Sequence, residues 1–175
     1  MVSIVGYTNA GKSTLFNALT DSDVVAKDQM FSTLDPTNRR LPRLPPPAPP
    51  VVLLSDTVGF IRDLPPDLAR AFRATLEELD ESDVLLHVVD GSDPDHEQHI
   101  SAVTRILHEL SLAERPRVVV VNKGDRLPEM ERMRLARELG AVVVSAQDPD
   151  SLPPLRQAIA DALDRARPVT SWASP

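Results

Sequence analysis

The chain has 175 residues, the size of one domain, and its 19 Lys and Arg against 26 Asp and Glu leave a net charge of −7. This acidic balance argues against a uniformly basic nucleic-acid binder, and the lack of cysteine excludes disulfides, thiol catalysis and Cys-ligated zinc. No apolar run approaches the roughly 18 residues of a membrane span and no signal peptide is evident, so we expect a cytoplasmic protein without a membrane span.

Short apolar runs without polar alternation predict strands that are buried on both faces of a parallel sheet. These runs are Val2–Tyr7, Val51–Asp56, Val84–Asp90, Arg117–Asn122 and Ala141–Val144. Apolar residues at helical spacing lie at 15–19, 68–79, 100–110, 130–139 and 155–163. The alternation of strands and helices predicts an α/β domain with helices on both faces of the sheet.

One segment interrupts this alternation, because residues 22–50 show no helical period and end in a proline-rich run. Proline lacks an N–H group, so residues 44–50 are not expected to pair within a sheet. We interpret Asn38–Leu44 as an edge strand that pairs with Val51–Asp56 through a proline turn. The predicted sheet therefore has six strands, mostly parallel, with one antiparallel edge strand. The domain is expected to cover residues 1–167, followed by a disordered tail at 168–175.

The strongest chemical signal is the octapeptide at residues 6–13, which matches G-x-x-x-x-G-K-[ST] in full. Its glycines allow the backbone to approach an anion, and its N–H groups converge on phosphates at a helix N-terminus. Lys12 is expected to lie between the β- and γ-phosphates, and the Ser13 hydroxyl to ligate Mg²⁺. The predicted phosphate-binding set is Gly6, Tyr7, Thr8, Asn9, Ala10, Gly11, Lys12, Ser13 and Thr14.

A second motif predicts that the base is guanine. Asn122-Lys123-Gly124-Asp125 follows an apolar strand, and the Asp125 carboxylate can accept hydrogen bonds from N1–H and the 2-amino group of guanine. Adenine offers neither donor, so such a site can reject it by roughly 10⁴-fold or more. Asn122 is expected to tie this loop to the phosphate loop, with the stem of Lys123 along the base plane. Ser145 and Ala146 would add a backbone N–H to guanine O6.

A third motif, Asp56-Thr57-Val58-Gly59, follows the strand at residues 51–54 and matches the D-x-x-G of nucleotide switches. Asp56 would hold Mg²⁺ through a water molecule. The Gly59 N–H would sense the γ-phosphate, whose loss would release the following segment. Together the three motifs predict a P-loop G domain that binds GTP or GDP.

With these motifs, the sequence resembles the G domain of the HflX family of ribosome-associated GTPases. The resemblance rests on residues 6–19, 31–40, 54–65, 71–78 and 86–90. It implies a Mg²⁺-dependent GTPase that acts on the large ribosomal subunit, in splitting or rescue of ribosomes. Because Met1 falls at the first strand, the family's N-terminal domain is expected to be absent, and large-subunit binding is expected of the full-length protein.

The resemblance also suggests the residues that act in catalysis. Thr33 is the expected switch residue, whose hydroxyl would reach Mg²⁺, with Thr37 as the alternative. Asn9 occupies the position at which related potassium-activated GTPases ligate K⁺, and the other interpretation is that Asn9 only shapes the loop. Phe60 stands where many GTPases carry the glutamine that orients the attacking water, so a slow intrinsic rate is expected. The expected catalytic set is Asn9, Lys12, Thr33 and Gly59, and the metal ligands are Ser13, Thr33 and Asp56.

Several alternatives stay open at this point. The domain would also fit a nucleotide sensor with negligible turnover, or the G domain of another ribosome-assembly or tRNA-modification GTPase. Arg39 and Arg40 are alternative cis-acting arginine fingers. A metal site at His96, His99 and His108 is disfavoured because no carboxylates converge on these residues in the sequence pattern.

Overall fold

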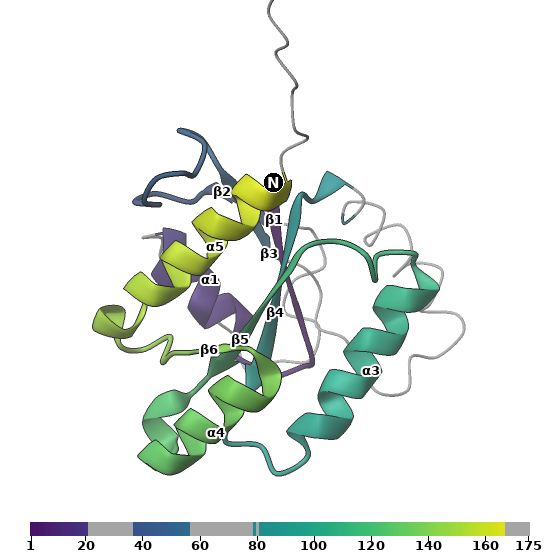
Figure 1. Ribbon diagram of the computed structural model, residues 1–175, viewed down its shortest axis with the longest axis vertical. Helices are drawn as coiled ribbons and strands as arrows, with labels where there is room; N and C mark the ends of the chain where they lie inside the picture. Colours follow the sequence, from purple (N-terminus) through teal and green to yellow (C-terminus); the bar gives the residue numbers. More distant parts are fainter. Residues whose placement is uncertain (21–36, 57–78, 80, 167–175) are drawn as a thin grey trace, which may run out of the picture.

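The computed structural model describes residues 1–20, 37–56, 79 and 81–166. A six-stranded sheet runs through them in the order β2-β3-β1-β4-β5-β6 (Figure 1). The strands are β1 (Val2–Gly6), β2 (Thr37–Arg40), β3 (Leu53–Asp56), β4 (Val84–Asp90), β5 (Arg117–Asn122) and β6 (Val142–Val143). The α-helices are α1 (Lys12–Thr20), α3 (His96–Glu109), α4 (Glu129–Leu139) and α5 (Pro153–Ala166).

The strand pairing confirms the predicted fold class. All neighbouring strands are parallel except β2, which pairs antiparallel with β3 and joins Thr37 to Asp56 and Arg40 to Leu53. The central strands β1 and β4 are buried along nearly their whole length, as continuous apolar runs with β-branched residues predict. The fold is therefore a mostly parallel α/β sheet with one antiparallel edge.

Helices cover both faces of the sheet. Helices α1 and α5 pack on one face, and α3 packs on the other, against β1 and β4 (Figure 1). Two apolar clusters hold these layers, one joining Phe16 and Ile159 to the sheet and one joining Val103 and Leu107 to it. No helix in the described ranges is long and apolar enough to cross a membrane.

The hairpin between β2 and β3 differs from the prediction in its length. The edge strand ends at Arg40 instead of Leu44, and its partner begins at Leu53 instead of Val51. One further bond, from the Leu41 N–H to the Val52 carbonyl at 2.8 Å, extends the pairing. Beyond it, Pro42 provides no N–H group, so the ladder cannot continue.

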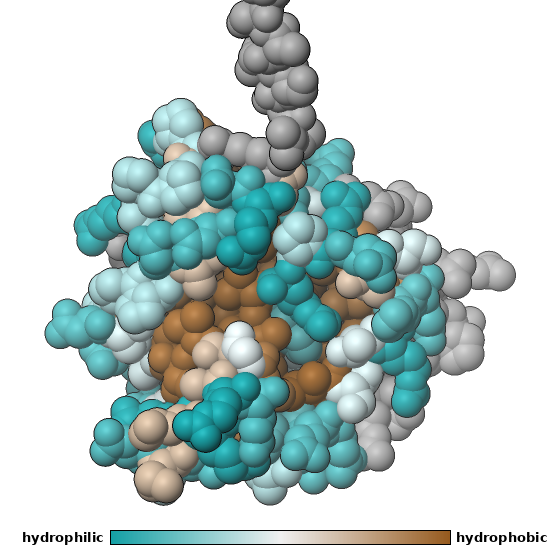
Figure 2. All heavy atoms as spheres, viewed as in Figure 1, coloured by the Kyte–Doolittle hydropathy of each residue, from teal (hydrophilic) through white to brown (hydrophobic). Residues whose placement is uncertain are grey.

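Helix α4 forms where its apolar spacing predicts, but the residues that it buries differ from those expected. The sequence pattern of Met130, Met133, Ala136 and Leu139 suggested a buried stripe, whereas the side chain turned fully inward is Leu135. Met130 and Met133 are 79% and 55% exposed, and pale brown residues lie on the surface over α4 in Figure 2. Of the expected helix at residues 68–79, only Leu79 belongs to the described residues.

Candidate nucleotide-binding site

Four neighbouring parallel strands end at one edge of the sheet, and each ends in a residue of the candidate site. Gly6 ends β1, Asp56 ends β3, Asp90 ends β4 and Asn122 ends β5. Ligands in α/β proteins bind outside the carboxyl ends of the strands, because the loops that leave these ends converge there. The fold therefore gathers the phosphate loop, the base loop and Asp56, the first residue of the third motif, at one edge.

The phosphate loop joins β1 to α1 and has the backbone shape that an anion cradle requires. Asn9 and Gly11 have φ angles of 62° and 89°, in the region that Asn and Gly enter most readily. A Cβ atom on Gly6 would lie 2.5 Å from the Val88 carbonyl oxygen, so only glycine fits beside β4. Helix α1 begins at Lys12, which directs its N-terminal N–H groups and the positive end of its dipole toward the loop.

Lys12 lies at the base of this loop with only 8% of its surface exposed. Its Nζ donates to the Tyr7 carbonyl oxygen at 3.1 Å. Burial lowers the pKa of Lys12 from 10.5 to about 8, although the negative charge of Asp56 opposes this shift. An ammonium group held in poorly hydrated surroundings interacts strongly with an anion that reaches it.

Ser13 and Asp56 form a pair of oxygen ligands beside Lys12. The Ser13 hydroxyl donates to Asp56 Oδ2 at 3.1 Å, and Asp56 is 4% exposed. A hydroxyl and a carboxylate oxygen at this separation are the hard donors that Mg²⁺ prefers. The residues present therefore fit a magnesium ion at the positions that the sequence motifs suggested.

Asn122 connects three loops that are far apart in the sequence. Its Nδ2 donates to the Ala10 carbonyl oxygen and its Oδ1 accepts from the Ala146 N–H, each at 3.0 Å. Asn122 is 2% exposed, so both bonds are shielded from water, and the nitrogen and the oxygen of its side-chain amide each have a partner. The base loop, the phosphate loop and the loop after β6 are thereby held together.

Asp90 is a site residue that the sequence analysis missed, and its contact with Lys123 identifies it. The Nζ of Lys123 donates to the Asn9 carbonyl oxygen at 3.0 Å and to Asp90 Oδ2 at 2.6 Å. Burial alone would raise the pKa of Asp90, but bonds from Lys123 and Ser92 outweigh it and lower this pKa below its ordinary value. Asp90 therefore orients Lys123. The β4–β5 register places Asp90 opposite Asn122, a pairing that only the tertiary structure shows.

Asp125 lies on the short 3₁₀ helix Gly124–Arg126, and its side chain is exposed. One pocket is lined by Asn122, Asp125 and Ala146, which the sequence analysis assigned to the base, and by Thr14 of the phosphate-binding set. The Ser145 N–H donates to Ser151 Oγ, and the Ala146 N–H to Asn122 Oδ1. Donation to guanine O6 by either N–H therefore requires that N–H to share its present bond.

The remaining sequence-predicted residues are placed less fully. Thr33, Gly59 and Phe60 lie outside the described residues, and for Thr37 the structure gives the backbone pairing with Asp56. Arg39 and Arg40 are exposed on the edge strand. Arg40 donates to the Pro50 carbonyl oxygen at 3.3 Å, at the end of β2 opposite the one that pairs with Asp56.

Gly11→Ala is expected to disrupt the junction between the phosphate loop and the base loop. A Cβ on Gly11 would overlap the Asn122 amide nitrogen, in a backbone conformation that side chains rarely adopt. We expect a loss of about 1–3 kcal/mol in the free energy of unfolding, and GDP affinity at least about tenfold weaker. Calorimetry and denaturant unfolding measure the two effects.

Gly140→Ala is the matched control. Gly140 also has a positive φ, 57°, but a Cβ there would meet nothing within 4 Å. Its replacement should cost about 1 kcal/mol of stability and leave GDP affinity unchanged. Equal effects of the two variants on GDP affinity would contradict the packing of Gly11 against Asn122.

Comparison with known proteins agrees with this geometry. Residues 1–123 match the family described as 50S ribosome-binding GTPase. The chain is 46% identical over 162 residues to GTPase HflX of Alkalihalophilus pseudofirmus, covering 93% of this chain and 37% of the relative. Against GTPase HflX of Escherichia coli K12 it is 46% identical over 166 residues, covering 93% of this chain and 38% of the relative. The chain thus spans less than two fifths of the length of these relatives.

Two solved structures of GTP-binding proteins match the chain in fold. A GTP-binding protein from the archaeon Sulfolobus solfataricus, in complex with GDP, matches with a TM-score of 0.76 and 28% identity, covering 95% of this chain and 53% of that one. A variant of Era from Aquifex aeolicus, at 24% identity and a TM-score of 0.72, covers 99% of this chain and 58% of that one, and shares the fold. The chain therefore belongs to the 50S ribosome-binding GTPase family, and over 93% of its length it is similar to part of GTPase HflX.

Proposed function

We propose that this chain binds GTP with Mg²⁺ and hydrolyses it slowly to GDP and phosphate, as the switch domain of a longer protein that acts on the large ribosomal subunit. The observation that carries the proposal is the pair of buried bonds through which Asn122 joins the phosphate loop to the two loops around the base. A guanine nucleotide in this site would span the same loops, which supports a ligand of that shape. Asp125 would select guanine through N1–H and the 2-amino group.

The phosphates would be held by backbone N–H groups of residues 6–14 and by Lys12. Lys12 would leave the Tyr7 carbonyl, 3.1 Å away, for the oxygens between the β- and γ-phosphates. Ser13 and Asp56, already in contact, would hold Mg²⁺. The ion would supply neutralisation of the charge that develops on the phosphate oxygens.

The switch itself is assigned from the sequence. Thr33, with Thr37 as the alternative, would complete the Mg²⁺ site only when the γ-phosphate is present, and the Gly59 N–H would contact that phosphate. After hydrolysis both contacts are lost, and an order–disorder change of the connected segments would report the nucleotide state. Phe60 cannot orient water by hydrogen bonding, so the intrinsic rate should be on the order of 10⁻⁴–10⁻² s⁻¹.

The same phenylalanine supports a second candidate, a GTP or GDP sensor with negligible turnover. Phosphate release separates the two candidates when it is measured with and without large ribosomal subunits. Turnover by the chain, or turnover stimulated by subunits in a version extended to the length of its relatives, supports the GTPase. Nucleotide binding without turnover in both conditions supports the sensor.

Potassium is expected to accelerate hydrolysis through the Asn9 side chain. Asn9 is exposed at the rim of the phosphate loop, while its carbonyl is held by Lys123, which leaves the side-chain amide as a candidate K⁺ ligand. A cation there would offset charge between the β- and γ-phosphates, and we expect turnover about tenfold or more faster in KCl than in NaCl at equal ionic strength.

Asn9→Gly tests that assignment with the backbone preserved, because glycine tolerates the φ of 62°. The variant should hydrolyse GTP at the NaCl rate in both salts. Equal wild-type rates in KCl and NaCl would contradict potassium activation and leave Asn9 as a residue that only shapes the loop.

The domain bounds and the cellular location are part of the same proposal. The domain would cover residues 1–167, with a short tail beyond, and would act in the cytoplasm, where ribosomes are found. The central experiment is a calorimetric titration of the chain with GTP, GDP and ATP. Binding of both guanine nucleotides, with ATP at least about 10³-fold weaker, is the expected result, and equal binding of ATP and GTP would contradict the base assignment.

A further inference from the structure

The phosphate loop makes one contact that its motif does not explain. The ring of Tyr7, the first residue after Gly6, stacks on the imidazole of His99, with ring centroids 3.7 Å apart and an interplanar angle of 9°. His99 lies in the first turns of α3, which packs on the face of the sheet opposite to α1. The stack therefore links the phosphate loop to a helix that carries none of the nucleotide motifs.

The imidazole of His99 is itself held in place. Its Nδ1 lies 3.3 Å from Asp93 Oδ2, and the other oxygen of Asp93 accepts from the Asp95 N–H at 2.9 Å. The side chains of His99 and Asp93 are 22% and 30% exposed. A ring fixed by a carboxylate that is itself hydrogen-bonded presents one face to Tyr7, so the stack has little freedom to rotate.

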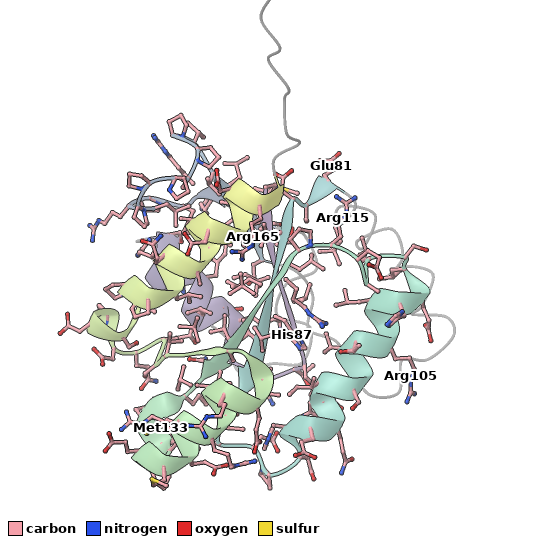
Figure 3. All side chains as sticks on the ribbon, in the orientation of Figure 1. Glu81, His87, Arg105, Arg115, Met133 and Arg165 are labelled. Carbon is pink, nitrogen blue, oxygen red and sulfur yellow. The ribbon has the colours of Figure 1, made fainter. Side chains whose placement is uncertain are left out.

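Strand β4 contributes a buried histidine beside the stack of Tyr7 and His99. His87 on β4 is 1% exposed, and burial together with Arg117 lowers its pKa to about 3, so it is uncharged. Figure 3 shows His87 between the sheet and α3. Tyr7, His87, Asp90 and His99 line one small cavity of about 10 Å³, the space of a single water molecule at most. Tyr7 also packs against the apolar cluster that contains Val103 and Leu107, so it is held both by His99 and by this cluster.

The backbone of Tyr7 is part of the nucleotide site. Its carbonyl oxygen accepts from Lys12 Nζ at 3.1 Å and from the Ala10 N–H at 3.3 Å. A side chain that is clamped restricts its own peptide groups, and a loop that is already ordered loses less conformational entropy when a ligand binds. The clamp on the Tyr7 ring therefore acts on the part of the loop that receives the phosphates.

We propose that His99 is a positioning residue for the phosphate loop, which holds Tyr7 by stacking and so preorganises the loop for a nucleoside diphosphate or triphosphate. The inference rests on the proposed function, since it concerns the same ligand. His99 would act through its contact with Tyr7, and its effect is expected in affinity for the phosphates.

The test is GDP affinity by calorimetry of the full chain in Mg²⁺ buffer. His99→Ala should bind GDP about threefold to tenfold more weakly, the range that loss of one aromatic pair implies. His99→Phe, which keeps the stack without the bond to Asp93, should stay within about twofold of wild type. His108→Ala removes an exposed histidine from the last turn of the same helix and should not change GDP affinity.

Tyr7 also offers a direct readout, because it is the only tyrosine in the chain. Selective labelling of tyrosine gives one set of ring resonances by NMR, which His99→Ala should move downfield by removing the ring current of the stacked imidazole. His99→Phe should keep them upfield. If His99→Ala fails to fold, His99→Gln, which is polar and not aromatic, should show the same weaker binding and the same shift.

Three outcomes overturn the inference in different ways. Unchanged GDP affinity with a displaced Tyr7 resonance would show that the stack exists but does not position the loop. Unchanged resonances would show that the stack is absent. A wild-type chain that binds neither GDP nor GTP would overturn the proposed function itself, and is distinguished by the parallel titration of the unmodified chain.

Discussion

Asp125→Asn is expected to exchange the base preference of the chain from guanine to xanthine. The amide keeps an oxygen for N1–H, but its nitrogen opposes the 2-amino group of guanine and can donate to the O2 of xanthine. GDP affinity should fall about 10²–10³-fold, because a charge-assisted bond is lost and a donor is left facing a donor. Competition calorimetry with guanosine and xanthosine diphosphates measures the exchange.

The control for this variant is Asp164→Asn. It makes the same change of charge on an exposed residue near the carboxyl end of α5, which lies beside the N-terminus, away from the loops of the site (Figure 1). Its base preference should be that of wild type. Asp125→Asn with unchanged preference for guanosine diphosphate would mean that another residue reads the base.

Lys12→Met is expected to remove nucleotide binding without weakening the fold. Charge-assisted bonds to the phosphates are lost, so affinity for GTP and GDP should fall about a hundredfold or more. The nucleotide-free protein should be no less stable than wild type at pH 7, because burial of the ammonium group is unfavourable, as its lowered pKa of about 8 indicates. Calorimetry and urea unfolding measure the two quantities.

The burial of Lys12 should also be visible in how the free energy of unfolding depends on pH. The folded pKa of Lys12 is about 8 and its ordinary value is 10.5. Between these values the unfolded chain binds more protons than the folded one, so the free energy of unfolding should rise with pH through this window. The difference between wild type and Lys12→Met isolates this contribution from other groups that titrate there.

An exposed residue again provides the control. Arg132→Met removes one positive charge from the solvent side of α4 and should change neither nucleotide affinity nor the slope between the two pKa values of Lys12. A Lys12→Met variant that loses more than about 1 kcal/mol of stability at pH 7 would contradict the view that burial of Lys12 is a cost to the fold.

The sequence predicted the structure correctly where the residue type allows only one backbone conformation or environment at its position. The proline-rich run at residues 44–50 had to lie outside the strand pairing, although Pro42 ends the edge strand earlier than predicted. Glycine at residues 6 and 11 had to accompany a tight loop. The continuous valine-rich runs at β4 and β5 could only be strands with two covered faces. In each case a property of the backbone or of one side chain decides the structure, so no knowledge of distant residues was needed.

The sequence was ambiguous where two helix faces are both partly apolar. In α4 the spacing of Met130 and Met133 suggested a buried stripe, but Leu135 packs inward and both methionines face solvent (Figure 3 labels Met133). A helical period states which residues share a face, and the neighbours of the helix decide which face is covered. The contacts of Asp90 with Lys123 and of His99 with Tyr7 were missed because each joins residues from separate segments of the chain.

By itself, the sequence determined the fold class, the phosphate loop and the carboxylate expected to read guanine, because these depend on local backbone chemistry and on motifs with fixed spacing. Only the tertiary structure showed that Lys12 is buried near Asp56, that Lys123 donates to Asp90, and that His99 stacks on Tyr7. These features arise from pairs of residues far apart in the chain. Their distances and burial are set when the strands align and the helices pack, and no local pattern contains that information.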